Sequence, residues 1–382
     1  MGVTRFRPAS LLILAYTALA VVIPVGTVAD PEEPDTVIWY EDDRHPIPMP
    51  EPEFPNETVT TYDENVARPT ARFFHPSRFI RRFGGDVALP AANVNAYDEV
   101  PNSTWFTNRI GLFPMTPESA ARGPRVDPPC PDGQWKVTGA KTDGVTAGCK
   151  IRDEEGEVFL LKMDPAGYPG TTVRASIISG RILHAAGYNV PDEYPLTFGP
   201  ENLGFETEAK FRAQDGEEIP LSKDSLLEIL GPPHTSDGRW IALASHFIKG
   251  TPLGPFDYQG RRGDDPNDRI DHEDRRELRG LRVFSAWLNH IDSKRDNTLD
   301  FYIGPPGQGY VEHYLIDFAS TLGSGGTGPF RKWGWEYGMD IPASTGRLLS
   351  LGLHESHWNS MERPWGLDEI GYMDNRGFNP SK

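Results

Sequence analysis

The feature that most constrains the fold is a polar segment between a helical pattern and an apolar run, within residues 289–320. Apolar residues before it recur at helical spacing, which predicts a helix from His272 to Asn289. Asp271 is the expected N-cap, and Asp274 completes a capping box. The apolar stripe comprises Leu278, Leu281, Phe284, Leu288 and Ile291. A helix packed in this way gives the polar segment a rigid support.

The polar segment carries His290, Asp292, Lys294 and Asn297, and a β-like run twenty residues later ends at Asp317. Phosphoryl transfer needs a carboxylate beside the accepting hydroxyl, plus an amide oxygen and a second carboxylate that hold magnesium on the phosphates. Asp292, Asn297 and Asp317 are groups of those three kinds. The alternative is an ordinary loop after a helix, with Asp317 capping the next turn.

The H-x-D-x-K-x-x-N string and the later Asp-Phe-Ala resemble the catalytic loop and the Asp-Phe-Gly of the protein-kinase-like fold. Ile291 replaces an arginine and Ala319 a glycine, so the chain is more similar to atypical members such as the phosphoinositide-kinase and HipA-like branches and secreted kinases. Residues 93–111 also resemble a string in a group of secreted bacterial proteins. That second resemblance, which runs to about residue 330, implies no established activity.

The kinase-like resemblance implies an α+β, bilobal fold, with a small β-rich lobe over residues 131–247 and a mostly helical large lobe over 248–382, which would be minimal or truncated. It implies that Asp292 and Lys294 are catalytic. Asn297 and Asp317 would bind Mg²⁺, and ATP or another nucleotide would be the second cofactor.

Short strands are predicted at Trp135–Val137, Cys149–Ile151 and Val158–Met163. Lys162 lies near the end of the third strand, where an ammonium is unfavourable without an anionic partner. The resemblance implies that Lys162 binds the α- and β-phosphates. The alternative is a lysine that snorkels at the edge of the sheet.

Two further nucleotide contacts are expected in the small lobe. Gly139, Gly144 and Gly148 lie in the first hairpin, where small residues let the backbone approach phosphates. They do not form a G-x-G-x-x-G pattern, so an ordinary flexible hairpin fits equally well. The strand over residues 240–248 precedes the lobe junction, and the hinge that faces adenine is expected from Ser245 to Phe247.

A helix is predicted from Thr172 to Ala186, and it contains no acidic residue. The resemblance implies a glutamate near Ser176 that pairs with Lys162. Either the lysine is poorly anchored, or a glutamate from another segment replaces this group. The candidates are Glu193, Glu206 and Glu208.

The amino-terminal end has the pattern of an export signal over residues 1–29, with early arginines, an apolar run and small residues before Asp30. Export to the periplasm or the extracellular space is therefore expected, with membrane attachment only if the apolar run is retained. Residues 30–75 are acidic and proline-rich, which predicts a tether or a strap over the folded body. Residues 76–130 are interpreted as an N-terminal extension.

Cys130 and Cys149 are the only cysteines, and in an oxidising compartment they predict one disulfide. The net charge of −17 argues against nucleic acid and anionic membrane surfaces as partners. The favoured function is an exported, atypical kinase-like phosphotransferase that acts on an unknown hydroxyl of a protein, sugar or small molecule. The alternatives are a pseudokinase-like nucleotide-binding or scaffold protein and an unrelated secreted interaction protein. The sequence does not specify the oligomeric state.

Overall fold

The computed structural model describes residues 37–54, 62–67, 70, 90–112, 114–124, 127–141, 146–212, 218–329, 331–333, 341–354 and 372–373. The expected export signal and Gly144 lie outside these residues. Within the described part, no helix combines the length and apolar character needed to cross a membrane.

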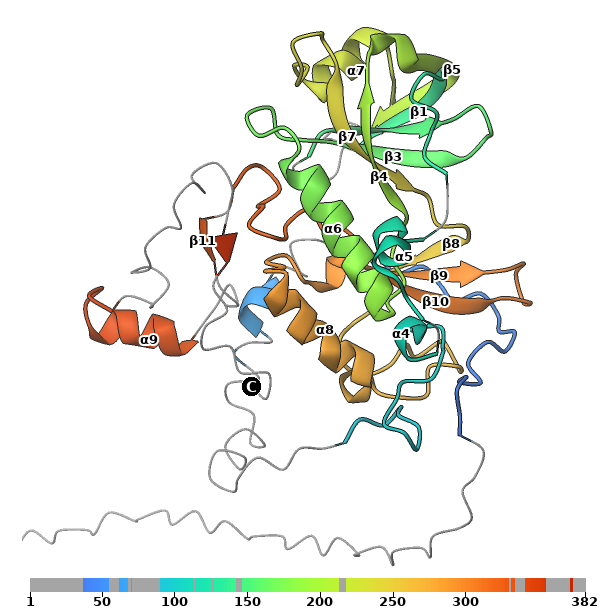
Figure 1. Ribbon diagram of the computed structural model, residues 1–382, viewed down its shortest axis with the longest axis vertical. Helices are drawn as coiled ribbons and strands as arrows, with labels where there is room; N and C mark the ends of the chain where they lie inside the picture. The colour runs from blue at the N-terminus through green and yellow to red at the C-terminus, as the bar shows by residue number, and fades with distance from the viewer. Residues whose placement is uncertain are drawn as a thin grey trace, which may run out of the picture. The chain divides into compact units, whose positions relative to one another are not determined.

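A seven-stranded sheet forms from the middle of the chain, residues 135–246, with its strands in the order β4-β7-β3-β2-β1-β5-β6 (Figure 1). Its strands are β1 (Trp135–Lys141), β2 (Gly148–Arg152), β3 (Val158–Met163), β4 (Glu193–Phe198), β5 (Leu203–Arg212), β6 (Glu218–Pro220) and β7 (Trp240–His246). Neighbouring strands are antiparallel except β1 and β5, which are parallel. The predicted strands are confirmed.

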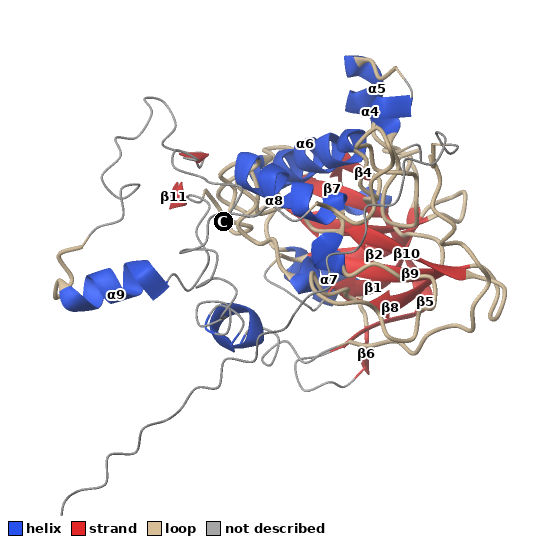
Figure 2. Ribbon diagram, turned by 90° about the horizontal axis from the view of Figure 1, so that it is seen from below, coloured by secondary structure: helices blue, strands red, loops and turns tan. Residues whose placement is uncertain are grey.

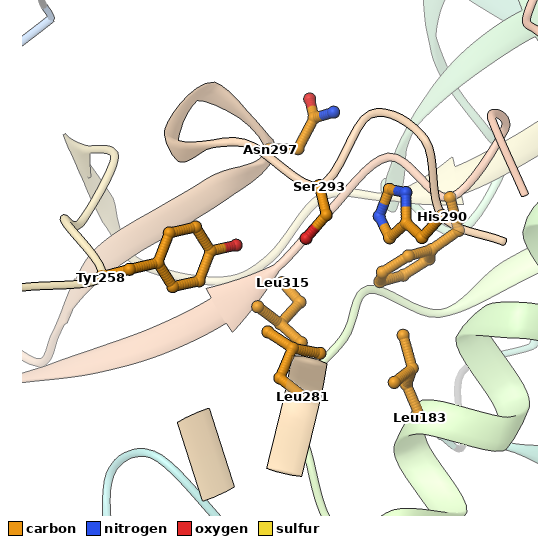
Figure 3. Close-up of a pocket in the computed structure, with 8 residues that line it drawn as sticks. Leu183, Tyr258, Leu281, His290, Ser293, Asn297 and Leu315 are labelled. Atoms are coloured by element: carbon orange, nitrogen blue, oxygen red, sulfur yellow. The ribbon is translucent and has the colours of Figure 1, made fainter. Parts of the chain in front are cut away.

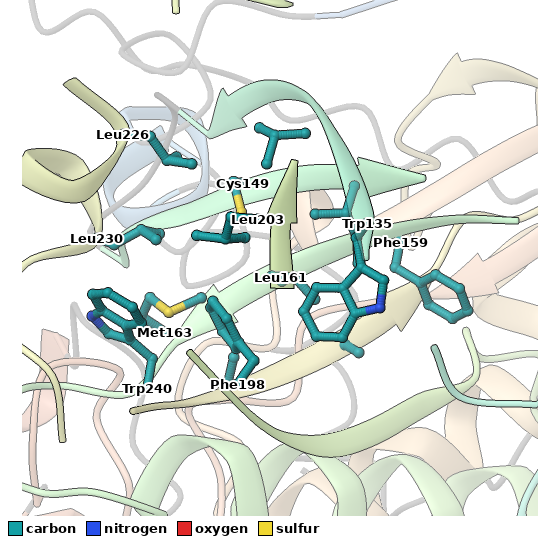
Figure 4. Close-up of a cluster of buried hydrophobic side chains, with 14 of the residues drawn as sticks. Trp135, Cys149, Phe159, Leu161, Met163, Phe198, Leu203, Leu226, Leu230 and Trp240 are labelled. Carbon is teal, nitrogen blue, oxygen red and sulfur yellow. The ribbon is translucent and has the colours of Figure 1, made fainter. Parts of the chain in front are cut away.

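Alternation along β3 gives the sheet two different faces. Phe159 and Leu161 are fully buried and point into an apolar core, whereas Leu160 and Lys162 alternate with them on the other face. The core residues drawn in Figure 4 include Trp135, Cys149, Phe198, Leu203 and Trp240. Helix α7 (Lys223–Leu230) adds the buried side chains of Leu226 and Leu230 to the same core.

The core position of Cys149 corrects the predicted disulfide. Both cysteines are unpaired, because Cys149 faces the sealed core while Cys130 lies exposed in the segment before β1. Burial raises the pKa of the Cys149 thiol to about 12, so this sulfur stays protonated and behaves as a small apolar group.

Helix α6 (Thr171–Ala186) follows β3, as predicted. Asp164 stabilises its first turn by accepting hydrogen bonds from the Thr172 and Val173 amides at 2.9 and 3.2 Å. Gly187, with φ +124°, ends the helix. The helix therefore has fixed ends on either side of Ser176, which hydrogen-bonds Glu193.

A second, three-stranded sheet has the order β10-β9-β8. It consists of β8 (Thr251–Gly254), β9 (Thr298–Ile303) and β10 (Tyr310–Leu315), and the structure seen from below in Figure 2 shows these strands with the helices. The other elements are η1 (Asp63–Ala67), α4 (Arg109–Leu112), α5 (Pro117–Arg122), η2 (Pro200–Asn202), η3 (His272–Asp274), α8 (Arg276–Trp287), η4 (Arg295–Asn297), β11 (Arg331–Trp333), α9 (Ile341–Leu349) and β12 (Tyr372–Met373). The fold is α+β. In its described residues, the region after 248 contains strands as well as helices.

The predicted capping box before α8 is wrong. The helix begins four residues later than expected, at Arg276, after the 3₁₀ turn η3. The Asp271 side chain makes no capping hydrogen bond and instead pairs with Arg261 at 2.9 Å. An ion pair outside the helix therefore replaces the cap that the spacing predicted.

Over residues 37–54, the acidic, proline-rich segment is a strap on the folded body rather than a tether. Ile47 is 4% exposed and packs with Leu253, Tyr302 and Val311. Its amide donates to the Gly309 carbonyl at 2.9 Å. Buried apolar surface and backbone pairing together hold a segment whose composition alone suggested disorder.

A buried group of charged and aromatic side chains lies beneath the strap, here named the Trp105 cluster. Its members are Trp105, Asp268, His272, Arg275, Glu277, Asp300 and His313. The Trp105 ring stacks on His313 with centroids 3.5 Å apart, and the Arg275 guanidinium lies 4.9 Å from the Trp105 ring. Hydrogen bonds join Asp268 to His272 at 2.8 Å and Asp300 to His313 at 2.6 Å. These contacts satisfy charges that would be unstable alone in the interior.

Candidate functional site

The β9–β10 hairpin brings together two residues that are twenty positions apart. Thr298 pairs with Leu315, and one step further the Ile316 amide donates to the Asn297 carbonyl at 3.0 Å. Asp317 follows directly. The antiparallel register therefore places the end of the polar segment beside Asp317.

Asp292 is held from two sides within the polar segment. The Asn297 amide nitrogen donates to the Asp292 carbonyl at 2.7 Å and to Asp292 Oδ2 at 3.0 Å. Lys294 Nζ lies 3.2 Å from Asp292 Oδ1. Because the nitrogen of the Asn297 amide binds Asp292, its oxygen points away from Asp292 and is oriented for another partner.

Lys162 reaches Asp317 from the large sheet, with Nζ 3.2 Å from Oδ2. The Lys162 side chain is 15% exposed and that of Asp317 is 39% exposed. Burial raises the pKa of Asp317, but the Lys162 ammonium outweighs burial and leaves this pKa below its ordinary value. Asp317 is therefore an ionised carboxylate that is partly open to solvent.

The backbone at Asp317 adopts the left-handed conformation, with φ +59°. Such a conformation is uncommon for residues other than glycine and persists only where neighbours hold it. Phe318, 1% exposed, supplies that hold, because a Cβ on Gly180 of α6 would lie 3.2 Å from its ring. Ser179 of α6 also hydrogen-bonds Thr321 at 2.7 Å. Helix α6 thus fixes the segment that carries Asp317.

His290 packs its ring against Phe318 with centroids 5.9 Å apart. The Ile291 amide donates to the Ser320 carbonyl at 3.1 Å, which joins the start of the polar segment to residues 317–320. Burial lowers the pKa of His290 to about 4, so the ring is neutral at neutral pH. His290 therefore acts as a packing residue in this geometry.

Glu193 of β4 is the carboxylate that approaches Lys162. Ser176 Oγ, at the helix position where a glutamate was expected, donates to Glu193 Oε2 at 2.6 Å. Ser245 also hydrogen-bonds Glu193. Burial raises the pKa of Glu193, and the Lys162 charge opposes that rise. The side chains of Glu206 and Glu208 lie outside the described residues.

Of the other residues expected to contact the nucleotide, Ser245 lies beside Glu193, whereas Gly139, Gly148 and Phe247 make contacts within or beside the sheet. Gly139 pairs with Lys150 within the sheet, and a Cβ on Gly148 would lie 2.2 Å from the Leu161 carbonyl oxygen. The smallness of Gly148 thus serves strand packing. Ser245 lies on β7 beside Glu193, whereas Phe247 follows β7, is 41% exposed and lies beneath the Lys150 ammonium at 4.7 Å.

A small pocket lies behind the polar segment (Figure 3). It is lined by Leu183, Tyr258, Leu281, His290, Ser293, Asn297, Leu315 and Phe318. Its cavity volume of ≈ 10 Å³ offers room for about one water molecule. It is a packing gap beneath the site and is too small for a nucleotide.

Sequence reasoning missed Lys141, whose positive charge contributes to the low pKa of Asp317 after that of Lys162. Its only sequence signal is its place at the end of β1, which has meaning only once the strand register is known.

Among the described residues, no three His, Cys, Asp or Glu side chains cluster as a metal site. Asn297 and Asp317 could hold a Mg²⁺ whose other ligands are phosphates and water. No protein-family model matches the chain, and no curated protein matches it.

Proposed function

We propose that this protein is an exported, atypical kinase-like phosphotransferase that moves a phosphoryl group from a magnesium nucleotide to a hydroxyl acceptor. The observation that carries the proposal is that Lys162 contacts Asp317, while the residue before Asp317, Ile316, is hydrogen-bonded to Asn297 of the 292–297 segment. These residues come from a strand, a loop and the end of a hairpin. An ordinary loop after a helix would not require Lys162, the 292–297 segment and Asp317 to lie together.

The chain's order of elements also supports the proposal. A hairpin, a lysine-bearing strand and a helix are followed by a strand that pairs with the lysine strand. The polar segment, a short hairpin and Asp317 come later. This is the order that the resemblance to the protein-kinase-like fold implies. The two-lobed arrangement is part of the same proposal.

Each residue has a role that its contacts support. Asp292 accepts the proton of the acceptor hydroxyl, because Asn297 and Lys294 fix its carboxylate while leaving it 41% exposed. Lys294 neutralises charge on the transferred group. Lys162 binds donor phosphates. Asp317 and Asn297 would hold magnesium, which would supply charge neutralisation on the phosphates.

Glu193 completes the proposed site. When Asp317 is engaged by metal, Lys162 needs another anionic partner to stay oriented. Glu193 stands close enough for its charge interaction with Lys162 to affect the pKa of Glu193, and Ser176 and Ser245 orient it. The carboxylate expected from the helix is therefore replaced by one from β4.

The test is a magnesium-dependent thermal shift with ATP, compared between the wild type and Asp317→Ala. A ligand present at 100 times its Kd stabilises the folded chain by about 2.7 kcal/mol. We expect that shift to vanish in Asp317→Ala and to persist in Asp237→Ala, which removes an exposed carboxylate elsewhere. Absence of any shift with wild-type protein would contradict the proposal and favour a secreted interaction protein.

A pseudokinase-like protein is the second candidate, favoured by the helix position at which Ser176 replaces the expected glutamate. Transfer assays with labelled ATP separate the two candidates. An active enzyme labels itself or an offered protein or sugar, and Asp292→Asn stops transfer while binding persists. Nucleotide binding by the wild type without transfer to any acceptor would favour the pseudokinase.

A further inference from the structure

Lys141 and Lys162 stand in one row across the large sheet. Lys141 of β1 pairs with Gly148 of β2, and Gly148 pairs with Lys162 of β3. Residues directly opposite one another on neighbouring strands point to the same face. Two ammonium-bearing side chains therefore occupy the face of the sheet opposite the apolar core, with a residue that lacks a side chain between them.

Gly148 determines the path of the Lys141 side chain. A Cβ at this position would lie 3.3 Å from Lys141 Cδ, so the stem of the lysine lies over β2. The stem thus runs along the row that leads to Lys162. A larger residue at position 148 would force Lys141 aside as well as meet the Leu161 carbonyl at 2.2 Å.

The Lys141 ammonium is placed at the base of the first hairpin. Nζ donates to the Thr146 carbonyl at 2.9 Å and to Thr146 Oγ1 at 3.4 Å. Lys162, in the same row, lies 3.2 Å from Asp317 Oδ2. The row therefore places two lysines on one face of the sheet, in a chain whose net charge is −17. Such a local concentration of positive charge attracts an anionic ligand.

We propose that Lys141 is a second phosphate-binding lysine of the donor site, acting beside Lys162 on the phosphate chain of a nucleoside triphosphate. This inference rests on the proposed function and adds a ligand-binding residue to it. A phosphate oxygen replaces the neutral Thr146 acceptors, because hydrogen bonds to a charged acceptor are stronger. Two lysines can contact different phosphates of one chain, whereas a monophosphate can satisfy only one of them well.

A purely structural role is the competing explanation. The Lys141–Thr146 bond joins the two strands at the base of the hairpin, and it could serve only to hold them together. In that case its loss would lower the stability of the empty protein and weaken every ligand alike. A phosphate-binding role instead makes the effect depend on the number of phosphates.

The experiment measures Kd values for Mg-ATP, AMP and adenosine, by calorimetry on the full chain. It compares wild type, Lys141→Met, Lys141→Arg and the control Lys136→Met, whose exposed lysine lies on the same strand. Loss of a charge-assisted hydrogen bond weakens binding about tenfold or more. We expect that loss for Mg-ATP in Lys141→Met, a smaller loss for AMP and none for adenosine. Lys141→Arg keeps the charge and should retain most of the Mg-ATP affinity, and Lys136→Met should match the wild type.

The outcomes separate this inference from the proposed function. If the wild type binds none of the three ligands, the proposed function fails and the inference fails with it. If the wild type binds Mg-ATP and Lys141→Met binds it equally well, only the Lys141 inference is overturned. Equal weakening of Mg-ATP and adenosine, with a lower melting temperature of the empty variant, also overturns it and assigns Lys141 to the hairpin alone.

Discussion

The Trp105 cluster and the proposed site contain similar side chains in different surroundings. In the cluster, the side chains of Asp268 and Arg275 are 0% and 1% exposed. In the proposed site, those of Asp292 and Asp317 are 41% and 39% exposed. Residue type alone therefore does not separate structural charges from groups available to a ligand.

The partners differ as well as the exposure. Cluster charges face fixed neighbours such as the pair Asp300–His313, so a ligand has no room to intervene. The two site carboxylates are each paired with a lysine at 3.2 Å, and a lysine can swing to a new partner. The comparison leads us to expect that variants in the cluster change stability, whereas variants in the site change ligand binding.

The largest expected effect is on stability, from Arg275→Met. This variant leaves Glu277 and Asp268 buried with one partner fewer, and breaking a buried ion pair costs about 3–5 kcal/mol. The matched control is Arg276→Met, because the Arg276 side chain forms its ion pair with Asp98 at the surface. Its expected loss is below about 1 kcal/mol. Urea unfolding of both variants measures the difference, and equal losses would remove the distinction between buried and exposed charge.

An intermediate effect is expected from Glu193→Gln, and on nucleotide binding rather than on stability. The amide is isosteric and can still accept from Ser176, but it removes the negative charge that Lys162 needs when Asp317 binds metal. The Mg-ATP Kd should rise about tenfold, a change of about 1.4 kcal/mol. Glu201→Gln, an exposed carboxylate paired with Arg239, is the control. Calorimetric titration measures the Kd values. An unchanged Kd for Glu193→Gln would contradict the role of Glu193 as the carboxylate that orients Lys162.

The smallest expected effect concerns pH. His290 has a pKa of about 4 in the folded chain and about 6.5 when unfolded, so only the unfolded chain gains this proton as the pH falls through 6.5. The contribution of His290 to folding stability should therefore fall between pH 6.5 and 4, by about 1 kcal/mol at pH 5 for a half-buried ring. His290→Gln removes this contribution. Between pH 7 and pH 5, the change in the free energy of unfolding measured with urea should be less unfavourable in the variant than in the wild type by about that amount.

Glu41 makes the comparison with the His290 variant necessary. Burial raises the pKa of Glu41 to about 7, so the folded chain gains this proton before the unfolded chain does. Its contribution makes stability rise as the pH falls from 7 towards 4.5, which is opposite to the His290 contribution. Identical pH dependence in wild type and His290→Gln would contradict the assignment to His290.

The sequence predicts the elements whose patterns are local. Alternation of apolar residues predicts β3, and helical spacing with Gly187 at the end predicts α6. The capping box at Asp271 was wrong because a distant residue, Arg261, binds its carboxylate. Local spacing does not reveal a competitor that lies ten residues away across a loop.

The residues of the candidate site also differ in whether local sequence could reveal them. Asp292, Asn297 and Asp317 could be identified from the sequence because one loop and one hairpin connect them along the chain. The roles of Glu193 and Lys141 could be recognised only once the pairing of the strands was known. Glu193 approaches Lys162 from β4, and Lys141 lies in the same row as Lys162 because both pair with Gly148. The disulfide prediction was wrong for a related reason: an even number of cysteines does not reveal that the Cys149 side chain points from β2 into the core while Cys130 is exposed.

The strap limits how far the amino-terminal end of this chain can be trimmed. The Asn267 side-chain amide donates a hydrogen bond to the His45 carbonyl at 2.9 Å, and the Ile47 side chain packs against Tyr302. Cleavage upstream of residue 37 leaves these contacts intact. A protease that cut after residue 50 would release the segment that carries both residues, which would expose the apolar surface around Tyr302 and leave the Asn267 side chain without this acceptor. Proteolytic trimming that preserves the folded body therefore has to stop before residue 45.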